Sequence, residues 1–219
     1  MKKYKITDES IMHNGIELFR IEAIKDFANV RKGDKGGFIA NESNLSHDGN
    51  CWIYDDAKVY EEARIYENAC IYNNTQVYGH AKVSGYACLY HNAKAFDYAF
   101  VRGDACLYNN SQVYHFAKVY NHAIICDYAK IYCCVIIHGN AIICGDALVG
   151  NTSDYIVFKN WWSSGRYFTW TRSNNLWKVG CFHGTGEKLI AKAYKDSELS
   201  GREYKRVVDY VESILNEKQ

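Results

Sequence analysis

The sequence predicts a mainly β protein wound as a parallel β-helix, in which short strands stack around one axis. Three observations lead to this prediction. A six-residue hydrophobic rhythm runs without a break from Ile53 to Asp154, the chain has no proline, and 19 of its 219 residues are tyrosine. Proteins average about 5% proline. Proline removes a ladder hydrogen bond from any strand that it enters, so its absence fits an array of strands.

The rhythm consists of 17 consecutive hexapeptides. Position one is a large aliphatic residue in every repeat except Ala95, and position five is small or β-branched. Positions five, six, one and two are expected to form a strand, with five and one facing inward and six and two facing outward. Positions three and four, rich in Asp, Asn, Gly, Glu and His, form the turn. Three repeats close a triangular coil, which gives about 5.7 coils.

This pattern resembles the hexapeptide-repeat, left-handed β-helix family. The flanks are similar to those of Tyr-rich members in bacterial, phage and prophage genomes. The matching residues are Tyr4-Lys5-Ile6-Thr7 and Gly33-Asp34-Lys35-Gly36-Gly37-Phe38-Ile39 before the array and Trp177-Lys178-Val179-Gly180-Cys181-Phe182-His183-Gly184-Thr185 after it. The resemblance implies a left-handed β-helix and transfers no catalytic residue. The family includes acyltransferases, γ-class carbonic anhydrases and proteins without assigned chemistry, and its members commonly form trimers.

The repeats divide the chain into three segments. Residues 1–52 are expected to form a β cap, because Asn14-Gly15 is a strong hairpin signal and an open coil end is a sheet edge. Residues 53–154 form the β-helix. Residues 155–219 combine strand-like sequence with two helices, expected near Glu187–Tyr194 and Gly201–Leu215. Thr185 stands where it can cap the first of them.

Net charge, hydrophobicity and cysteine content argue against several classes of function and location. The formal net charge is +1, which gives no general field for attracting nucleic acid or an anionic membrane. No stretch approaches the about 18 apolar residues of a membrane span. The first residues, Met1-Lys2-Lys3-Tyr4, lead into polar sequence rather than an apolar signal core. With nine cysteines and no signal peptide, we expect reduced thiols in the cytoplasm of a bacterial host cell.

Residues 18 positions apart stack on one side of the coil, so the sequence defines three outer faces. Face one is the side whose strand positions carry no charged residue. Its outward residues are Trp52, Tyr54, Cys70, Tyr72, Cys88, Tyr90, Cys106, Tyr108, Ile124, Cys126, Ile142 and Cys144. At roughly 4.8 Å per coil this strip is roughly 30 Å tall, and a patch of that size usually meets a partner. Three alternatives remain for what covers face one. It is covered by a second copy of the chain in a homo-oligomer, for which a trimer is favoured, by the C-terminal segment, or by a ligand.

The other two faces carry charge. Face two holds Lys58 and the residues that follow it at intervals of 18, and face three holds Arg64 and its successors in the same way. Both are expected to be solvated, with lysine stems between tyrosine rings. In the last coils the outward residues include Ile124, Ile136, Ile142 and Leu148, which predicts that the tail docks there.

Candidate chemistry is sparse. His80, His91, His115 and His122 occupy turn positions and are not expected to converge, as metal or acid–base chemistry requires. The cysteines match no CxxC zinc spacing, so neither a metal site nor a cofactor is expected. Trp161, Trp162 and Trp170 are read as core packing, with a ligand-stacking or base-stacking site as the alternative.

These observations favour a non-enzymatic, oligomeric scaffold or interaction protein, with no expected catalytic residue. The similarity to phage-type members adds a specific version, in which the protein binds a host protein or a small nucleotide signal. The alternative is an acyl-coenzyme A-dependent acyltransferase of the hexapeptide class. That alternative is disfavoured because the 17 repeats contain no inserted loop from which a substrate pocket could be built.

Overall fold

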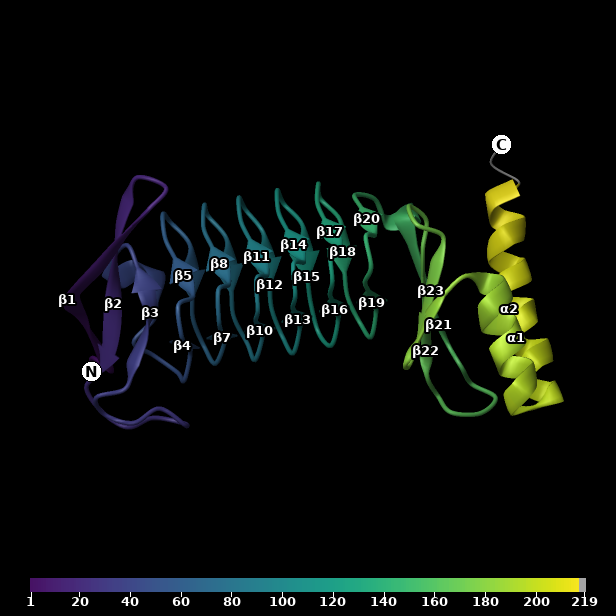
Figure 1. Ribbon diagram of the computed structural model, residues 1–219, viewed down its shortest axis with the longest axis horizontal. Coiled ribbons are helices and arrows are strands. Elements are labelled where there is room, and N and C mark those ends of the chain that lie inside the picture. Colours follow the sequence, from purple (N-terminus) through teal and green to yellow (C-terminus); the bar gives the residue numbers. More distant parts are fainter. Residues whose placement is uncertain (217–219) are drawn as a thin grey trace.

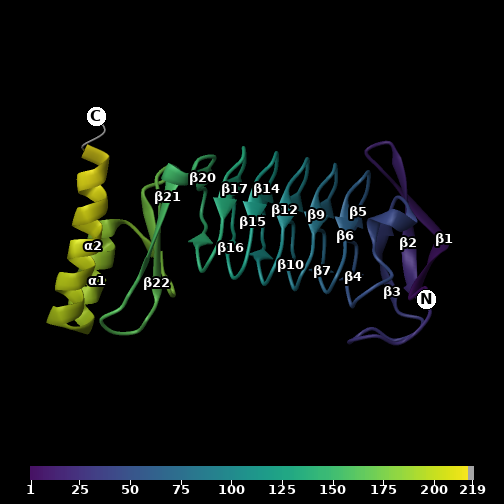
Figure 2. The same ribbon diagram turned by 180° about the vertical axis from the view of Figure 1, so that it is seen from behind.

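The computed structural model describes residues 1–216 and is a β-solenoid. Figures 1 and 2 show an elongated molecule, with the N-terminal cap at one end, stacked coils along the axis, and a small sheet followed by two helices at the other end. The prediction of a mainly β fold of parallel stacked coils is confirmed.

The coils contribute three parallel sheets, one for each predicted face. Face one is formed by β4 (Trp52–Ile53), β7 (Cys70–Ile71), β10 (Cys88–Leu89), β13 (Cys106–Leu107), β16 (Ile124–Ile125) and β19 (Ile142–Ile143). Face two is formed by β5 (Lys58–Val59), β8 (Gln76–Val77), β11 (Lys94–Ala95), β14 (Gln112–Val113), β17 (Lys130–Ile131) and β20 (Leu148–Val149). Face three is formed by β6 (Arg64–Ile65), β9 (Lys82–Val83), β12 (Phe100–Val101), β15 (Lys118–Val119) and β18 (Ile136–Ile137).

Each strand is only two residues long and consists of positions six and one of the repeat. Successive coils pair in register at a separation of 18 residues, so Cys88 lies between Cys70 and Cys106. The position-one residues and the position-five residues up to Ala147 are buried, and the hydrophobic ones among them form one continuous core along the axis. The last position-five residue, Ser153, is exposed in the 3₁₀ helix that ends the array. The period in the sequence therefore determines which residues are neighbours.

The turns explain why positions three and four are polar. All 16 position-three residues from Asp55 to Gly145 have a positive φ, between 54° and 74°. This left-handed conformation is accessible to Gly, Asn and Asp at low cost. The acidic or amide side chain then reaches the next coil, as where Asp97 Oδ2 accepts a hydrogen bond from His115 N at 3.1 Å. Asp55, Glu61, Glu67, Asn73 and Asp127 accept the equivalent backbone hydrogen bond 18 residues on.

The N-terminal cap extends face two and covers the first coil. Strands β1 (Tyr4–His13) and β2 (Ile16–Ala23) form an antiparallel hairpin, and β3 (Lys35–Ile39) joins β2 to β5. The 3₁₀ helix η1 (Glu42–Asn44) follows. Trp52 is fully buried beneath the cap, with the rings of Tyr4 and Phe27 edge-on to it at 6.2 and 5.4 Å.

The C-terminal segment covers the other end of the coil stack. After η2 (Thr152–Asp154), strands β21 (Tyr155–Lys159), β22 (Tyr167–Thr171), β23 (Leu176–Val179) and β24 (Phe182–Gly184) form an antiparallel sheet. The predicted docking on the last coils is confirmed. Ile142 N donates to Thr169 Oγ1 at 3.0 Å, and Leu148 N donates to Ser173 Oγ at 2.7 Å.

Two helices pack on the far side of this sheet (Figure 1). Helix α1 spans Gly186–Asp196 and is capped by Thr185, as expected. Helix α2 spans Glu198–Asn216, so the expected start at Gly201 is wrong. Ser197 Oγ accepts from Ser200 N and begins the helix earlier, while Gly201 lets the ring of Tyr194 approach the backbone. Neither helix is long and apolar enough to cross a membrane.

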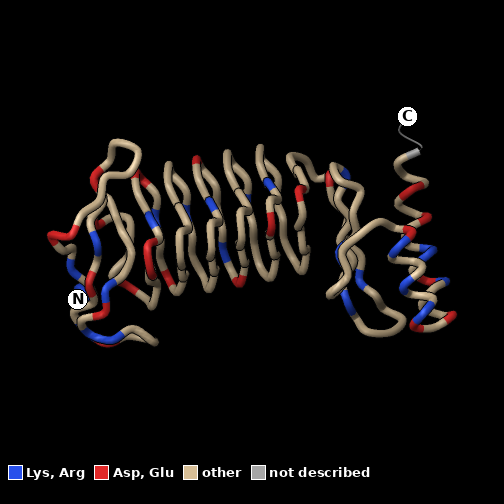
Figure 3. Tube along the Cα trace, in the orientation of Figure 1, with Lys and Arg blue, Asp and Glu red and all other residues tan. Residues whose placement is uncertain are grey.

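Charged residues are unevenly distributed along the axis. Figure 3 shows that most of the coil surface carries neither acid nor base, whereas the cap and the two helices carry many of both. Residues 155–219 contain 11 basic and 7 acidic residues, and residues 53–154 contain 7 and 10. The uncharged character of face one is thus part of a wider scarcity of charge along the solenoid.

Candidate functional site

Face one is a continuous strip of apolar and thiol side chains. Cys70, Cys88 and Cys106 are half-buried and stacked in register. The rings of Tyr54 and Tyr72 stack at 4.3 Å. Further along, Tyr90 and Tyr108 stack at 5.2 Å. The position-six and position-two side chains that the sequence assigned to this strip are therefore brought together.

The two ends of face one are covered by the chain itself. At the first coil Tyr54 donates its hydroxyl hydrogen bond to Asn29 Oδ1 at 2.8 Å, and Phe27 packs on Trp52. At the last coil Thr169 of β22 receives the hydrogen bond from Ile142. The four coils between, from Cys70 to Ile124, keep half-exposed side chains. The C-terminal segment thus covers one end of this face and leaves its middle open.

Two thiols of this middle region, those of Cys88 and Cys106, are protonated at neutral pH. Burial, together with the neighbouring Cys70 and Cys106, raises the pKa of Cys88 to about 11. Burial and the nearby Asp104 carboxylate raise the pKa of Cys106 as well. A thiol with a raised pKa is a poor nucleophile. These cysteines therefore act as small apolar groups of the strip.

Face two carries an aromatic ladder that the sequence analysis did not expect. Lysine stems do not separate its rings. Tyr60, Tyr78, Phe96, Tyr114 and Tyr132 stack directly on one another at 5.1, 5.0, 4.8 and 5.7 Å. The coil spacing of roughly 4.8 Å matches the distance at which parallel rings pack, so identical positions stack ring on ring.

The turn histidines do not converge on a common site. His115 Nε2 lies 3.9 Å from Asp97 Oδ2, and His122 Nδ1 lies 3.5 Å from Asp104 Oδ2, at different corners of the prism. His80 stacks on the ring of Tyr98 at 4.7 Å. All of these imidazoles are exposed on convex corners. Within one chain they form no catalytic or metal-ligating cluster.

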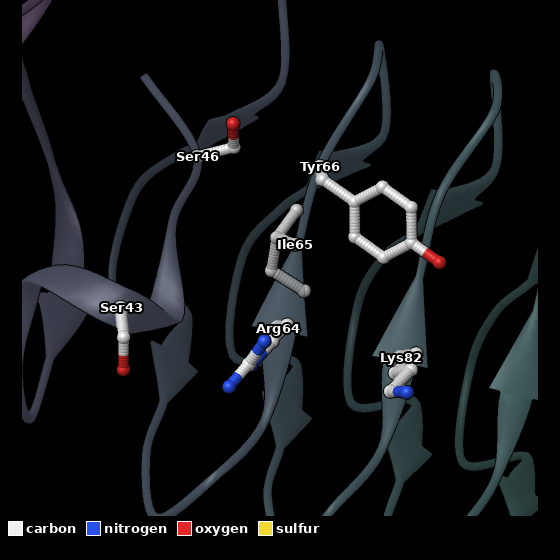
Figure 4. A pocket seen from close by; sticks show the side chains of 6 residues that line it. All are labelled: Ser43, Ser46, Arg64, Ile65, Tyr66 and Lys82. Atoms are coloured by element: carbon white, nitrogen blue, oxygen red, sulfur yellow. The ribbon is translucent and has the colours of Figure 1, made fainter. Parts of the chain in front are cut away.

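A shallow hollow of about 360 Å³ lies where the cap meets face three. Figure 4 shows Arg64 and Lys82 on neighbouring strands, with the Tyr66 ring beside them and Ser43 on the cap. Among the residues that the structure describes, neither Arg64 nor Lys82 forms an ion pair. Two free cations beside a hydroxyl group suit a small anion. Sequence reasoning missed this hollow because the cap loop that completes it is set by tertiary packing.

A second cluster missed by the sequence analysis lies at the last coils. The ligand atoms of Cys126, Asp127 and Cys144 are within 4.8 Å of one another, and both cysteines are buried. The hydrogen bond between the two sulfurs lowers the pKa of Cys126 and raises that of Cys144. The signal was present in the sequence. The two cysteines are 18 residues, or one coil, apart, and the first is followed directly by an acid.

The three tail tryptophans considered as a stacking site lie in different environments. Trp170 is buried in the core between the C-terminal sheet and the helices, and its Nε1 donates to Asn175 Oδ1 at 2.8 Å. Trp162 packs against the same core at its edge, whereas Trp161 is 83% exposed. The rings of Trp161 and Trp162 meet edge-on at 6.1 Å. Core packing accounts for Trp170, and only Trp161 offers an open face.

Comparison with known proteins gives a partial match to a curated protein. No model of a known protein family matches the sequence. A stretch of 63 residues is 41% identical to the uncharacterized acetyltransferase YdcK of Escherichia coli (strain K12). The match covers 25% of this chain and 19% of that protein. The hexapeptide period, the stacked parallel coils and this match together support a hexapeptide-repeat β-helix family for the chain.

Proposed function

We propose that this protein is a non-enzymatic β-solenoid scaffold that assembles with copies of itself through face one. The observation that carries the proposal is the open middle of that face. There, half-buried cysteine, tyrosine and isoleucine side chains line four successive coils without one charged strand position. Faces two and three bear Lys or Arg in most of the same coils.

The shape of the face supports a second copy as the partner. The strands pair in parallel and in register at 18-residue intervals, so the surface repeats at every coil. A repeating surface can match itself across a rotation axis, as closed oligomers require. Three prisms that each offer one uncharged side would bury all three sides at a common axis. We therefore favour a homotrimer.

Light scattering tests the assembly. The unmodified chain is expected to have about three times the mass of one chain, and Cys88→Arg to have the mass of one, because a charge would be buried at the centre of the interface. Phe100→Arg is the matched control, since Phe100 is a half-buried position-six residue of the same coil on face three. Circular dichroism checks that both variants are folded. A monomeric unmodified chain, or dissociation caused equally by both substitutions, contradicts the proposal.

The second candidate is acyl transfer, which the similarity to an uncharacterized acetyltransferase favours. Every turn of the array from 55 to 146 has two residues, so an acyl donor would have to bind between subunits. We expect acetyl-coenzyme A to leave the melting temperature unchanged, since the coils build no inserted loop around a groove. A clear rise in melting temperature, lost in His115→Ala or His122→Ala, would show that acetyl-coenzyme A binds and would favour acyl transfer instead.

For partners other than the chain itself we propose a phage-type role, in which the scaffold binds a host protein or a small nucleotide. The hollow beside Arg64 and Lys82 supports the nucleotide, because it offers two cations to a phosphate and the ring of Tyr66 to a base. The scaffold proposal does not depend on which of these partners is bound.

A further inference from the structure

We propose that Cys126, Asp127, Cys144 and His183 bind a zinc ion that joins the last coils to the C-terminal sheet. The first three residues come from two adjacent coils on face one, and the fourth comes from β24. Zinc is bound in proteins by thiolate, imidazole and carboxylate groups, usually four in a tetrahedron. This ligand set and its position between two separate parts of the fold fit a structural zinc site.

The spacing of the three solenoid donors fits such an ion. Their ligand atoms lie within 4.8 Å of one another. With bonds of about 2.0 to 2.3 Å, donors around a tetrahedral zinc ion are roughly 3.5 Å apart. Side-chain rotations that move the donor atoms by about 1 Å would therefore bring all three into bonding distance of one metal ion. Both cysteines are already shielded from solvent, with 3% and 4% of their surface exposed.

The Asp127 carboxylate is held in place by its neighbours. Its Oδ1 accepts from Asn109 Nδ2 at 3.0 Å, and its Oδ2 accepts from Gly145 N at 3.0 Å. Each carboxylate oxygen has a second lone pair that stays free for a cation. Metal-binding carboxylates are typically oriented by hydrogen bonds of this kind.

His183 lies on the C-terminal sheet beside the cluster, outside the three residues whose ligand atoms are within 4.8 Å of one another, and would complete the site by a side-chain movement. In β23, Trp177 and Val179 face the helical core, so Lys178 between them points to the solenoid side. His183 is the cross-strand partner of Lys178 and shares that side. Its ring lies against the turn of the last coil: a Cβ added to Gly145 would be 3.0 Å from His183 Cε1 and 3.5 Å from Nε2. The absent side chain at Gly145 leaves room for the imidazole.

Charge also balances at this position. Two thiolates, one carboxylate and Zn²⁺ leave a single negative charge. Lys178 is the cross-strand partner of His183 and lies on the same side of the C-terminal sheet, so its ammonium group faces the solenoid there. It would neutralise that remaining charge beside the ion. In contrast, among the described residues the stacked Cys88 and Cys106 of the same face belong to no group of three such ligand atoms within 4.8 Å of one another.

Cobalt binding to the full chain tests the site. Reduced, metal-free protein is titrated with Co²⁺, whose thiolate complexes absorb in the near ultraviolet, and then with Zn²⁺ as competitor. We expect one equivalent of Co²⁺ to bind and to be displaced by Zn²⁺. The double variant Cys126→Ser/Cys144→Ser is expected to lose the signal. The matched double variant Cys88→Ser/Cys106→Ser, two stacked cysteines of the same face, is expected to retain it.

His183→Ala tests the bridge to the sheet. His183 is exposed, so this substitution leaves the fold intact. It is expected to weaken metal binding on the order of tenfold or more and to reduce the rise in melting temperature that Zn²⁺ produces. Loss of the cobalt signal in both double variants, or in neither, overturns the site. Unchanged affinity in His183→Ala overturns the bridge, and a Cys126–Cys144 disulfide in freshly purified protein overturns the proposal as a whole.

Discussion

Replacing Leu107 by alanine is expected to lower the free energy of unfolding by about 2 to 5 kcal/mol. Leu107 is a position-one residue on β13, fully buried, and pairs in register with Leu89 below it and Ile125 above it. The coil backbones are joined by hydrogen bonds on both sides of this layer, so the walls cannot collapse into the vacated space. The lost burial and the remaining cavity therefore both add to the cost.

Urea unfolding followed by circular dichroism measures this effect. Tyr86→Ala is the control, because Tyr86 occupies a turn position in the same region and is 66% exposed. Substitutions at such surface sites usually change stability by no more than about 0.5 kcal/mol. An equal decrease in the free energy of unfolding in the two variants would contradict the expectation, because it would mean that burial of the position-one residues does not stabilise the coils.

Alkaline pH is expected to unfold the protein cooperatively between about pH 10 and pH 12. Burial raises the pKa of Tyr60 to about 12, and burial also raises the pKa of Tyr78, Tyr90 and Tyr114. An unfolded tyrosine loses its proton near pH 10, so above that pH the unfolded chain releases protons that the folded chain retains. The stabilisation is complete below pH 10 and is lost as pH rises through the folded pKa values.

Tyrosinate absorbance at 295 nm, recorded together with circular dichroism, measures this transition. Both signals should change together, and the melting temperature should fall steadily above pH 10. Tyr60→Phe removes one of these protons and should make the fall less steep. Lys3, whose pKa burial lowers, acts in the opposite direction but is a single group. Tyrosines that ionise in folded protein, before the circular dichroism changes, would contradict the expectation.

The repetitive part of the fold could be predicted from the sequence because its contacts are periodic. A residue in the coils meets the residue 18 positions away, so Cys70, Cys88 and Cys106 could be aligned without coordinates. The composition of face one followed from the same rule. The strands proved shorter than expected, because only positions six and one have strand geometry before each turn begins.

The segments before and after the coils have no such 18-residue periodicity, so their contacts could not be predicted from spacing in the sequence. Helix α2 begins at Glu198 rather than Gly201, because Ser197 provides a cap and Gly201 packs against Tyr194. The sequence analysis read Trp161, Trp162 and Trp170 as core packing, but Trp161 lies in the turn after β21 and is exposed, whereas Trp170 is buried on β22. Such outcomes depend on contacts between elements rather than on spacing along the chain.

The sequence by itself determined the solenoid, its three faces and the uncharged strip, since a strict six-residue period allows one way to bury an aliphatic and a small residue in every repeat. Only the tertiary structure decided how the ends are covered. It placed the cap beside Arg64 and brought His183 to Gly145, and so made the cation-lined hollow and the cysteine cluster recognisable. The physical reason is that these neighbours come from non-repeating segments, whose docking depends on surface complementarity.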